Sequence, residues 1–146
     1  MTNKEKNVKT ILEIFNAIEQ RDISRQQDLV QPDVELHWPP SLPYGGTTRG
    51  MKRERPGWGE TWIPLQPTEA ERKMDPRIVA ANDDEVIVLW HQRGVSAAGD
   101  KLDVEVLALY AFRDGKLARA QMFYFDTAAV LNFLSKANSK PVRSRL

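Results

Sequence analysis

The second half of the chain contains four stretches rich in strand-forming apolar residues, and turn-forming residues separate them. These stretches predict four β-strands, at residues 77–81, 85–95, 101–113 and 116–125. The last two strands are separated only by Asp114 and Gly115, a pair expected in a tight hairpin because both positions tolerate positive φ. Strands joined by such short turns pair antiparallel, so the sequence predicts a meandering sheet.

The first half of the chain begins with a pattern typical of an amphipathic helix. Its apolar residues recur at three- and four-residue steps, at Val8, Ile11, Leu12, Phe15 and Ile18. Thr2 and Glu5 have the spacing of a capping box and predict where this helix starts. Ser24 and Gln27 repeat that spacing and predict a second helix, which Pro32 should end because proline cannot continue the hydrogen-bond ladder.

The region between the helices and the meander holds one short strand and a long irregular segment. Residues 34–38 alternate with period two and predict a strand that ends at Pro39. Residues 39–76 contain seven of the nine prolines and five of the eight glycines, which is too many for regular structure. Because this segment also holds Trp58 and Trp62, we expect a flap that packs its indole rings onto the domain.

These elements in this order are typical of an α+β domain, with a curved antiparallel sheet wrapped around the N-terminal helices as a cone-shaped barrel. We expect a single domain over residues 1–135 that ends in a short helix, with Asp126 as the N-cap. Residues 136–146 are predicted to be a frayed basic tail. The concave space between helices and sheet is where a small-molecule pocket is expected.

The composition excludes several classes of function. The 21 Lys and Arg residues balance 20 Asp and Glu residues, for a formal charge of +1, so no strong field draws the protein to nucleic acid or an anionic membrane. The absence of cysteine excludes disulfides, thiolate metal sites and a cysteine nucleophile. No apolar run could span a bilayer, and no signal peptide, metal-ligand cluster or phosphate-binding glycine loop is recognisable. We therefore expect a cytoplasmic protein without a cofactor or metal and without nucleic-acid or membrane partners.

Three blocks of the sequence resemble those of a known superfamily. They are residues 32–39 (PDVELHWP), residues 42–50 (LPYGGTTRG) and residues 112–127, which begin with FRDGKL and end with YFDT. In these blocks, and in the order of its elements over residues 5–135, the chain resembles the nuclear-transport-factor-2-like proteins, in particular their SnoaL-like, ketosteroid-isomerase-like branch. The resemblance implies the cone-shaped fold. It also implies an isomerase, cyclase or dehydratase that moves a proton on a hydrophobic, carbonyl-bearing substrate.

The catalytic groups of such relatives do not carry over to this chain. By the resemblance, the three positions used by steroid isomerases correspond here to Phe15, Trp38 and Ala108, none of which transfers a proton. The aspartate of the polyketide cyclases corresponds to Met122. Epoxide-hydrolysing relatives need an Asp–Arg–Asp cluster, and Arg93 is expected to lack one because positions 91 and 95 are His and Val. The four unreactive positions are therefore candidate ligand contacts.

His37 and His91 are the only side chains that ordinarily titrate near neutral pH, so an acid–base step would most simply use one of them. Each lies beside a tryptophan, and neighbours on a strand point to opposite faces. The apolar alternation favours an inward Trp38, with His37 on the other face or at the rim. For His91 the hairpin register decides. One register turns Trp90 and Gln92 inward, and a shift by one residue turns His91 inward instead.

Aromatic residues supply the other candidates. Tyr110 and Tyr124 share the inward face in this scheme and are candidate catalytic donors, because a phenolic hydroxyl can polarise a ligand carbonyl. The alternative is that both are core residues with satisfied hydroxyls. The candidate ligand-binding set combines the positions above with further aromatic residues: Phe15, Trp38, Tyr44, Trp58, Trp62, Trp90, Ala108 and Met122.

Three functions are open at this point. The first is an enzyme in which a histidine acts as base and tyrosine hydroxyls polarise the carbonyl of a small hydrophobic substrate. The second is a module that binds a hydrophobic small molecule without chemistry, and the third is a protein-interaction domain. We also expect a homodimer, because Leu107, Leu109 and Ala111 form an apolar stripe on the outer face of the predicted sheet.

Overall fold

The computed structural model describes residues 1–51 and 64–138. Within them the chain forms, in order, helices α1 (Asn3–Glu19) and α2 (Ile23–Leu29), strands β1 (Val30–Trp38) and β2 (Gly46–Arg49), helix α4 (Glu69–Arg72), strands β3 (Arg77–Ala81), β4 (Glu85–Val95), β5 (Lys101–Arg113) and β6 (Lys116–Tyr124), and helix α5 (Thr127–Asn138). The flap residues Trp58 and Trp62 and the tail after residue 138 lie outside the described residues. Residues 136–138, predicted to belong to the frayed tail, form the end of α5 instead. None of the described helices is long and apolar enough to cross a membrane.

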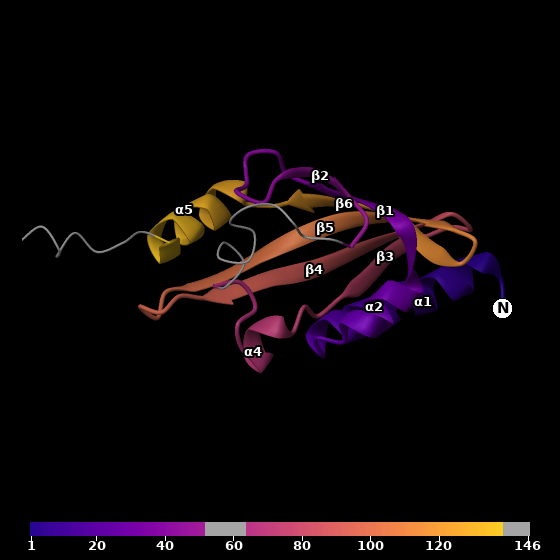
Figure 1. The fold of residues 1–146 in the computed structure, drawn as a ribbon, viewed down its shortest axis with the longest axis horizontal. Helices are drawn as coiled ribbons and strands as arrows, with labels where there is room; N and C mark the ends of the chain where they lie inside the picture. Colours follow the sequence, from indigo (N-terminus) through magenta and orange to yellow (C-terminus); the bar gives the residue numbers. More distant parts are fainter. Residues whose placement is uncertain (52–63, 139–146) are drawn as a thin grey trace, which may run out of the picture.

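The described strands form one sheet in the order β2-β1-β6-β5-β4-β3 (Figure 1). The predicted α+β class, with N-terminal helices and a curved sheet, is confirmed, although the sheet does not close into a barrel and is mixed. β1 lies parallel to β6, with Leu36 opposite Ala120, whereas the other neighbouring strands are antiparallel. The parallel pair is possible because β1 and β6 are far apart in the sequence, so the chain between them can return to the same end of the sheet.

The pairing of β4 with β5 determines which side chains face the helices. Trp90 lies opposite Val106, and both are buried on the inner face together with Gln92. The register that turns His91 inward is therefore wrong, because side chains alternate between the two faces along a strand.

The turns and strand ends of the meander agree closely with those predicted from the sequence. β3, β4 and β5 have the predicted bounds, and β6 ends one residue early, at Tyr124. Asp114 and Gly115 have positive φ values of 53° and 76°, as expected for a tight hairpin.

α1 begins at the predicted residue but buries a somewhat different face. The Thr2 hydroxyl accepts a hydrogen bond from the Glu5 amide at 3.2 Å, which caps the helix. Phe15 is buried as predicted, whereas Leu12 is 39% exposed and Ile14 is buried in its place. The face of α1 that packs against the sheet therefore contains residues 11, 14 and 15, and residue 12 lies beside this face.

The cap predicted for the second helix at Ser24 is wrong. Asp22 caps α2 instead, and its carboxylate accepts a hydrogen bond from the Arg25 amide at 3.0 Å. β1 follows the helix directly, so Pro32 lies within the strand and does not end the helix. The strand tolerates proline there because the β1–β6 register is irregular over this segment, and an unpaired position needs no amide donor.

α1 and α2 lie toward one end of the sheet, and α5 lies toward the other (Figure 1). Asp126 caps α5 as predicted, by accepting a hydrogen bond from the Ala129 amide at 3.0 Å. A Cβ atom on Gly94 would lie 2.5 Å from the Pro64 carbonyl oxygen. Glycine therefore lets the segment after residue 64 run against β4, which brings this segment to the cavity described below.

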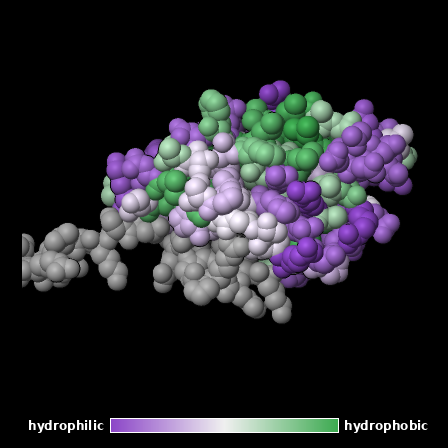
Figure 2. Space-filling view, turned by 90° about the horizontal axis from the view of Figure 1, so that it is seen from above, coloured by the Kyte–Doolittle hydropathy of each residue, from purple (hydrophilic) through white to green (hydrophobic). Residues whose placement is uncertain are grey.

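Apolar residues gather in one area of the surface, bordered by hydrophilic residues, on the face shown in Figure 2. On the outer face of the sheet, Leu107 of β5 lies opposite Phe123 of β6, and these residues are 42% and 52% exposed. Leu109 and Ala111, which complete the predicted apolar stripe, are half-buried.

Candidate functional site

A cavity of about 120 Å³ lies between α1, α2 and the inner face of the sheet. Its apolar lining residues are Ile11, Ile14, Phe15, Ile18, Ile23, Val30, Val34, Leu36, Trp38, Met51, Met74, Trp90, Leu117, Ala120 and Met122. Its polar lining residues are Arg21, Gln26, Gln66, Gln92 and Tyr110. A dry apolar cavity of about 150 Å³ holds a molecule the size of benzene, so this cavity suits a compact ligand.

The cavity brings together part of the predicted site. The predicted site residues that line it are Phe15, Trp38, Trp90, Tyr110 and Met122. Tyr44, Ala108 and Tyr124 are buried but are not among its lining residues. His37 and His91 lie on the outer face of the sheet. Among the described residues, no group of three or more His, Cys, Asp or Glu side chains could hold a metal ion.

Gln92 is the most deeply buried polar residue of the cavity, at 0% exposure. Its Oε1 accepts a hydrogen bond from the Tyr124 hydroxyl at 3.4 Å, and that hydroxyl lies 2.7 Å from the hydroxyl of Tyr44. Because Tyr124 donates its proton to Gln92, Tyr44 is the donor between the two phenols. The Gln92 Nε2 has no hydrogen-bond partner among the described residues. Gln92 lines the cavity, so a buried donor without a partner among the described residues lies in the cavity wall.

The tyrosines of this region are neutral hydrogen-bonding groups. Burial raises the pKa of Tyr110, and its contact with Trp90 offsets only part of this effect. Burial also raises the pKa of Tyr44 and of Tyr124, and the neighbouring Tyr44 raises that of Tyr124 further. All three phenols keep their protons at neutral pH, so they act through O–H dipoles and not as bases.

His37 is held on the outer face, where β1 pairs with β2. Its Nδ1 lies 2.9 Å from the Thr47 hydroxyl, and its Nε2 lies 3.6 Å from a Glu35 carboxylate oxygen. Trp38 takes the inward position, as the apolar alternation predicts. The His37 ring therefore points away from the cavity.

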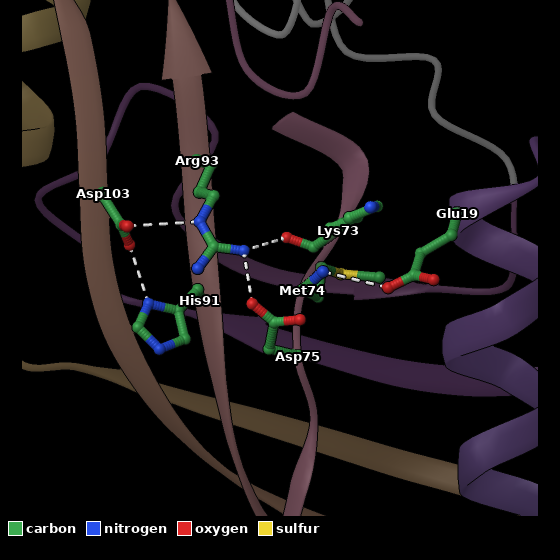
Figure 3. A network of polar contacts seen from close by, with 7 residues as sticks. All are labelled: Glu19, Lys73, Met74, Asp75, His91, Arg93 and Asp103. Carbon is green, nitrogen blue, oxygen red and sulfur yellow. Dashed lines mark hydrogen bonds and ion pairs between the residues drawn. The ribbon is translucent and has the colours of Figure 1, made fainter. Parts of the chain in front are cut away.

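His91 belongs to a polar network on the outer face, drawn in Figure 3. Its Nδ1 lies 2.7 Å from Asp103 Oδ1, and Arg93 Nε donates to the other Asp103 oxygen at 3.1 Å. Through Nη1, Arg93 also donates to the Asp75 carboxylate at 2.8 Å and to the Lys73 carbonyl at 2.5 Å. The prediction that Arg93 lacks two carboxylate partners is therefore wrong. They come from β5 and from the segment before β3, so spacing along β4 does not reveal them.

The network in Figure 3 holds one wall of the cavity from outside. Met74 lines the cavity and is 2% exposed. It lies between Lys73 and Asp75 in the sequence, which both accept hydrogen bonds from Arg93 Nη1. The Met74 amide donates to Glu19 Oε1 at 2.9 Å, and its carbonyl accepts from the His91 amide at 2.8 Å. An imidazole oriented by a carboxylate can act as a general base, but the His91 ring faces away from the cavity.

Sequence reasoning missed Gln92 and Arg21 as site residues. Gln92 carried a usable signal, because it interrupts an otherwise apolar series on the inward face of its strand. Arg21 carried none, because its position depends on the turn after α1 and on a contact with Gln66, 45 positions further along the chain.

A comparison with known protein families identifies the family. A family model described as a SnoaL-like domain matches residues 11–120 of the chain. The chain belongs to the SnoaL-like family. No curated protein matches this SnoaL-like protein.

Solved structures similar to this SnoaL-like protein share its fold at low sequence identity. Bal32a, from a soil-derived mobile gene cassette, has a TM-score of 0.73 and 18% identity over 91% of this chain and 99% of that chain. An NTF2-like protein from Burkholderia xenovorans has a TM-score of 0.69 and 18% identity over 93% and 98%. A candidate SnoaL-like polyketide cyclase from Jannaschia has a TM-score of 0.69 and 16% identity over 97% of each chain. The resemblance to the SnoaL-like branch of the NTF2-like superfamily is therefore confirmed.

Proposed function

We propose that this SnoaL-like protein binds a small, largely apolar molecule that carries a hydrogen-bond acceptor, such as a carbonyl oxygen. The observation that carries the proposal is the Gln92 amide, which is fully buried in the cavity wall and whose Nε2 lacks a partner among the described residues. A buried polar group without a hydrogen bond costs about 1–3 kcal/mol. A ligand carbonyl that accepts from Nε2 recovers this cost, so the amide selects for an acceptor.

The two phenols next to Gln92 support this role. Tyr44 donates to Tyr124, and Tyr124 donates to the Gln92 oxygen, so this oxygen is occupied and the orientation of the amide is set. Hydrogen bonds in such a chain polarise one another, which strengthens the donor at its end. The Gln92 N–H groups are therefore a preorganised partner for an acceptor in the cavity.

The remaining walls select for an apolar body. Phe15 packs edge-to-face against both Trp90 and Tyr110, with ring centroids 6.0 Å apart in each pair. Rings packed in this way form a rigid wall, and each square ångström of apolar surface that the ligand buries contributes about 25 cal/mol. A compact ligand with an apolar body and one carbonyl group matches this lining.

Binding is favoured over proton transfer by the chemistry of the described walls. The titratable side chains among the described lining residues are Arg21 and Tyr110, and neither loses its proton near neutral pH. The expected bases, His37 and His91, face away from the cavity. The described walls therefore supply donors that polarise a carbonyl group, but no general base that removes a proton beside it.

The test compares acetophenone with ethylbenzene, which has a similar shape but no acceptor. We expect the wild-type protein to bind acetophenone about 10-fold more tightly, because one recovered hydrogen bond contributes about 1–1.5 kcal/mol. Titration calorimetry or NMR titration measures both affinities. In Gln92→Leu the preference should disappear, whereas the control Gln121→Leu, on the outer face of β6, should retain it. Equal binding of the two compounds by the wild-type protein, or binding of neither, contradicts the proposal.

A further inference from the structure

Arg21 occupies a position after α1 that favours glycine. Its amide donates to the Ile18 carbonyl at 3.1 Å, and the Asp22 amide donates to the Ala17 carbonyl at 2.9 Å, which is the pattern of a Schellman motif. The residue after the cap in this motif adopts a left-handed conformation, and Arg21 has a φ of 57°. A residue other than glycine costs about 1–2 kcal/mol in this conformation. Hydrogen bonds of the arginine side chain, described next, can offset this cost.

The Arg21 guanidinium and that of Arg72 reach the same oxygen atom. Arg21 Nη2 donates to the Gln66 carbonyl at 2.5 Å, and Arg72 Nε donates to it at 3.3 Å. Arg72 Nη2 also donates to the Pro67 carbonyl at 3.2 Å. Gln66 is buried, has a φ of 54°, and is tied to β4 by a bond of 2.9 Å from its amide to the Arg93 carbonyl. Two positive charges are thus held together beside a rigid part of the sheet, and of the two residues Arg21 lines the cavity.

These two charges have no counter-ion among the described residues. Neither Arg21 nor Arg72 forms an ion pair with a described carboxylate, whereas Arg25 pairs with Glu13 at 2.5 Å and Arg93 pairs with two aspartates. Burial and the charge of Arg72 both lower the pKa of the Arg21 guanidinium. Like charges held close together repel each other, and an anion that contacts both removes this repulsion.

We infer that Arg21 and Arg72 bind the carboxylate of the cavity ligand, which makes the ligand a compact apolar carboxylate. This inference rests on the proposed function, because it names the ligand class of the same cavity. Arg21 lines the cavity, so its guanidinium can meet a charge at the edge while the apolar body lies inside. The contacts with Gln66 and Pro67 leave N–H donors on both guanidinium groups. The planar fork of a guanidinium matches the two oxygens of a carboxylate.

The test compares benzoate with benzamide, which has the same shape and no charge. We expect the wild-type protein to bind benzoate about 10-fold more tightly in titration calorimetry at low ionic strength, with a smaller advantage at high salt. Arg21→Gly, which suits the left-handed turn, and Arg72→Gln should each bring the ratio of the benzoate affinity to the benzamide affinity close to one. Arg72→Lys keeps the charge and should preserve most of the preference for benzoate. The control Arg25→Gln removes the same charge from α2, outside the cavity lining, and should preserve this preference in full.

Equal affinity of the wild-type protein for benzoate and benzamide would overturn the inference. An unchanged benzoate advantage in both Arg21→Gly and Arg72→Gln would overturn it as well. Either result leaves the proposed function standing, provided that acetophenone still binds more tightly than ethylbenzene. If none of the four compounds binds, the proposed function fails, and the inference that depends on it fails with it.

Discussion

The hydroxyl oxygens of Tyr44 and Tyr124 lie 2.7 Å apart, although 80 residues separate them in the sequence. Tyr44 lies between β1 and β2, and Tyr124 is the last residue of β6. Trp38 packs edge-to-face against both rings, with centroid distances of 5.3 and 6.5 Å. The phenol pair therefore joins the β1–β2 connection to the centre of the sheet, and Tyr124 also donates a hydrogen bond to the Gln92 oxygen.

The phenol pair should act as one unit in stability. Tyr124→Phe should lower the free energy of unfolding by about 1–3 kcal/mol, because it removes the donor of the buried Gln92 oxygen and the acceptor of Tyr44. Tyr44→Phe removes the first bond of the chain and should cost about 0.5–1.5 kcal/mol. In urea unfolding, the double variant should lose about 1 kcal/mol less than the sum of the two single losses. Strictly additive losses would show that the two hydroxyls are not coupled.

The meander could be predicted in detail because its information is local. β3, β4 and β5 begin and end at the predicted residues, because turn residues lie between them, and β4 and β5 also alternate between a buried and a more exposed face. The inward position of Trp90 follows from the same alternation once the hairpin register is known. The parallel pairing of β1 with β6 has no local signal, because it depends on where a long connection returns.

The candidate site could be predicted only in part, for the same physical reason. Trp38 and Trp90 were found because an aromatic residue on the inward face of a strand faces the cavity. The carboxylate partners of Arg93 and the contact of Arg21 with Gln66 join segments that are distant in the sequence. No spacing within one element reveals such contacts, so the Arg21 site and the network around His91 required the three-dimensional structure.

Arg21→Gly and Arg21→Ala remove the same guanidinium group but differ in their backbone preference. Because position 21 has a φ of 57°, Arg21→Ala should be less stable than Arg21→Gly by about 1 kcal/mol in urea unfolding. The preceding residue provides the control, since Gln20 has a φ of −85° in the right-handed region. At position 20, Gln20→Ala should therefore be more stable than Gln20→Gly. The same order of stability at both positions would contradict the left-handed turn.

Asp103→Asn should lower stability at neutral pH and have no effect in acid. Partial burial raises the pKa of the Asp103 carboxyl, but the hydrogen bonds and positive charges of His91 and Arg93 outweigh it and hold the pKa below its ordinary value. A carboxyl of this kind contributes stability above its unfolded pKa of about 3.9, and this contribution is lost as the pH falls through the folded pKa. The Asp103 side chain is 53% exposed, so solvent screening limits the contribution to about 0.5–1 kcal/mol.

Urea unfolding at pH 7 and at about pH 2 measures this difference. The control is Asp28→Asn, an exposed aspartate on α2 that forms no ion pair with the described residues, and it should leave stability unchanged at both pH values. If Asp103→Asn lost the same stability at both values, the loss would come from packing and not from the charges of the network.

The outer face of the sheet leads to a prediction about assembly. Leu107 lies between Leu89 of β4 and Phe123 of β6, so three apolar side chains form a row across three strands. Leu107 and Phe123 are exposed in the single chain, which is unfavourable for a contiguous row in water. We propose that a second copy of the chain covers this row, because a two-fold axis brings the same apolar row onto itself.

Sedimentation equilibrium tests this homodimer. The wild-type protein should be a dimer at micromolar concentrations, and Leu107→Lys and Phe123→Lys should each shift it toward monomer, because each places a charge in the apolar contact. Leu12→Lys introduces the same charge at a residue on α1 that is 39% exposed, away from this face, and should leave the dimer intact. A wild-type monomer would show that the row is left in water. A dimer insensitive to both outer-face substitutions would show that the copies meet through a different surface.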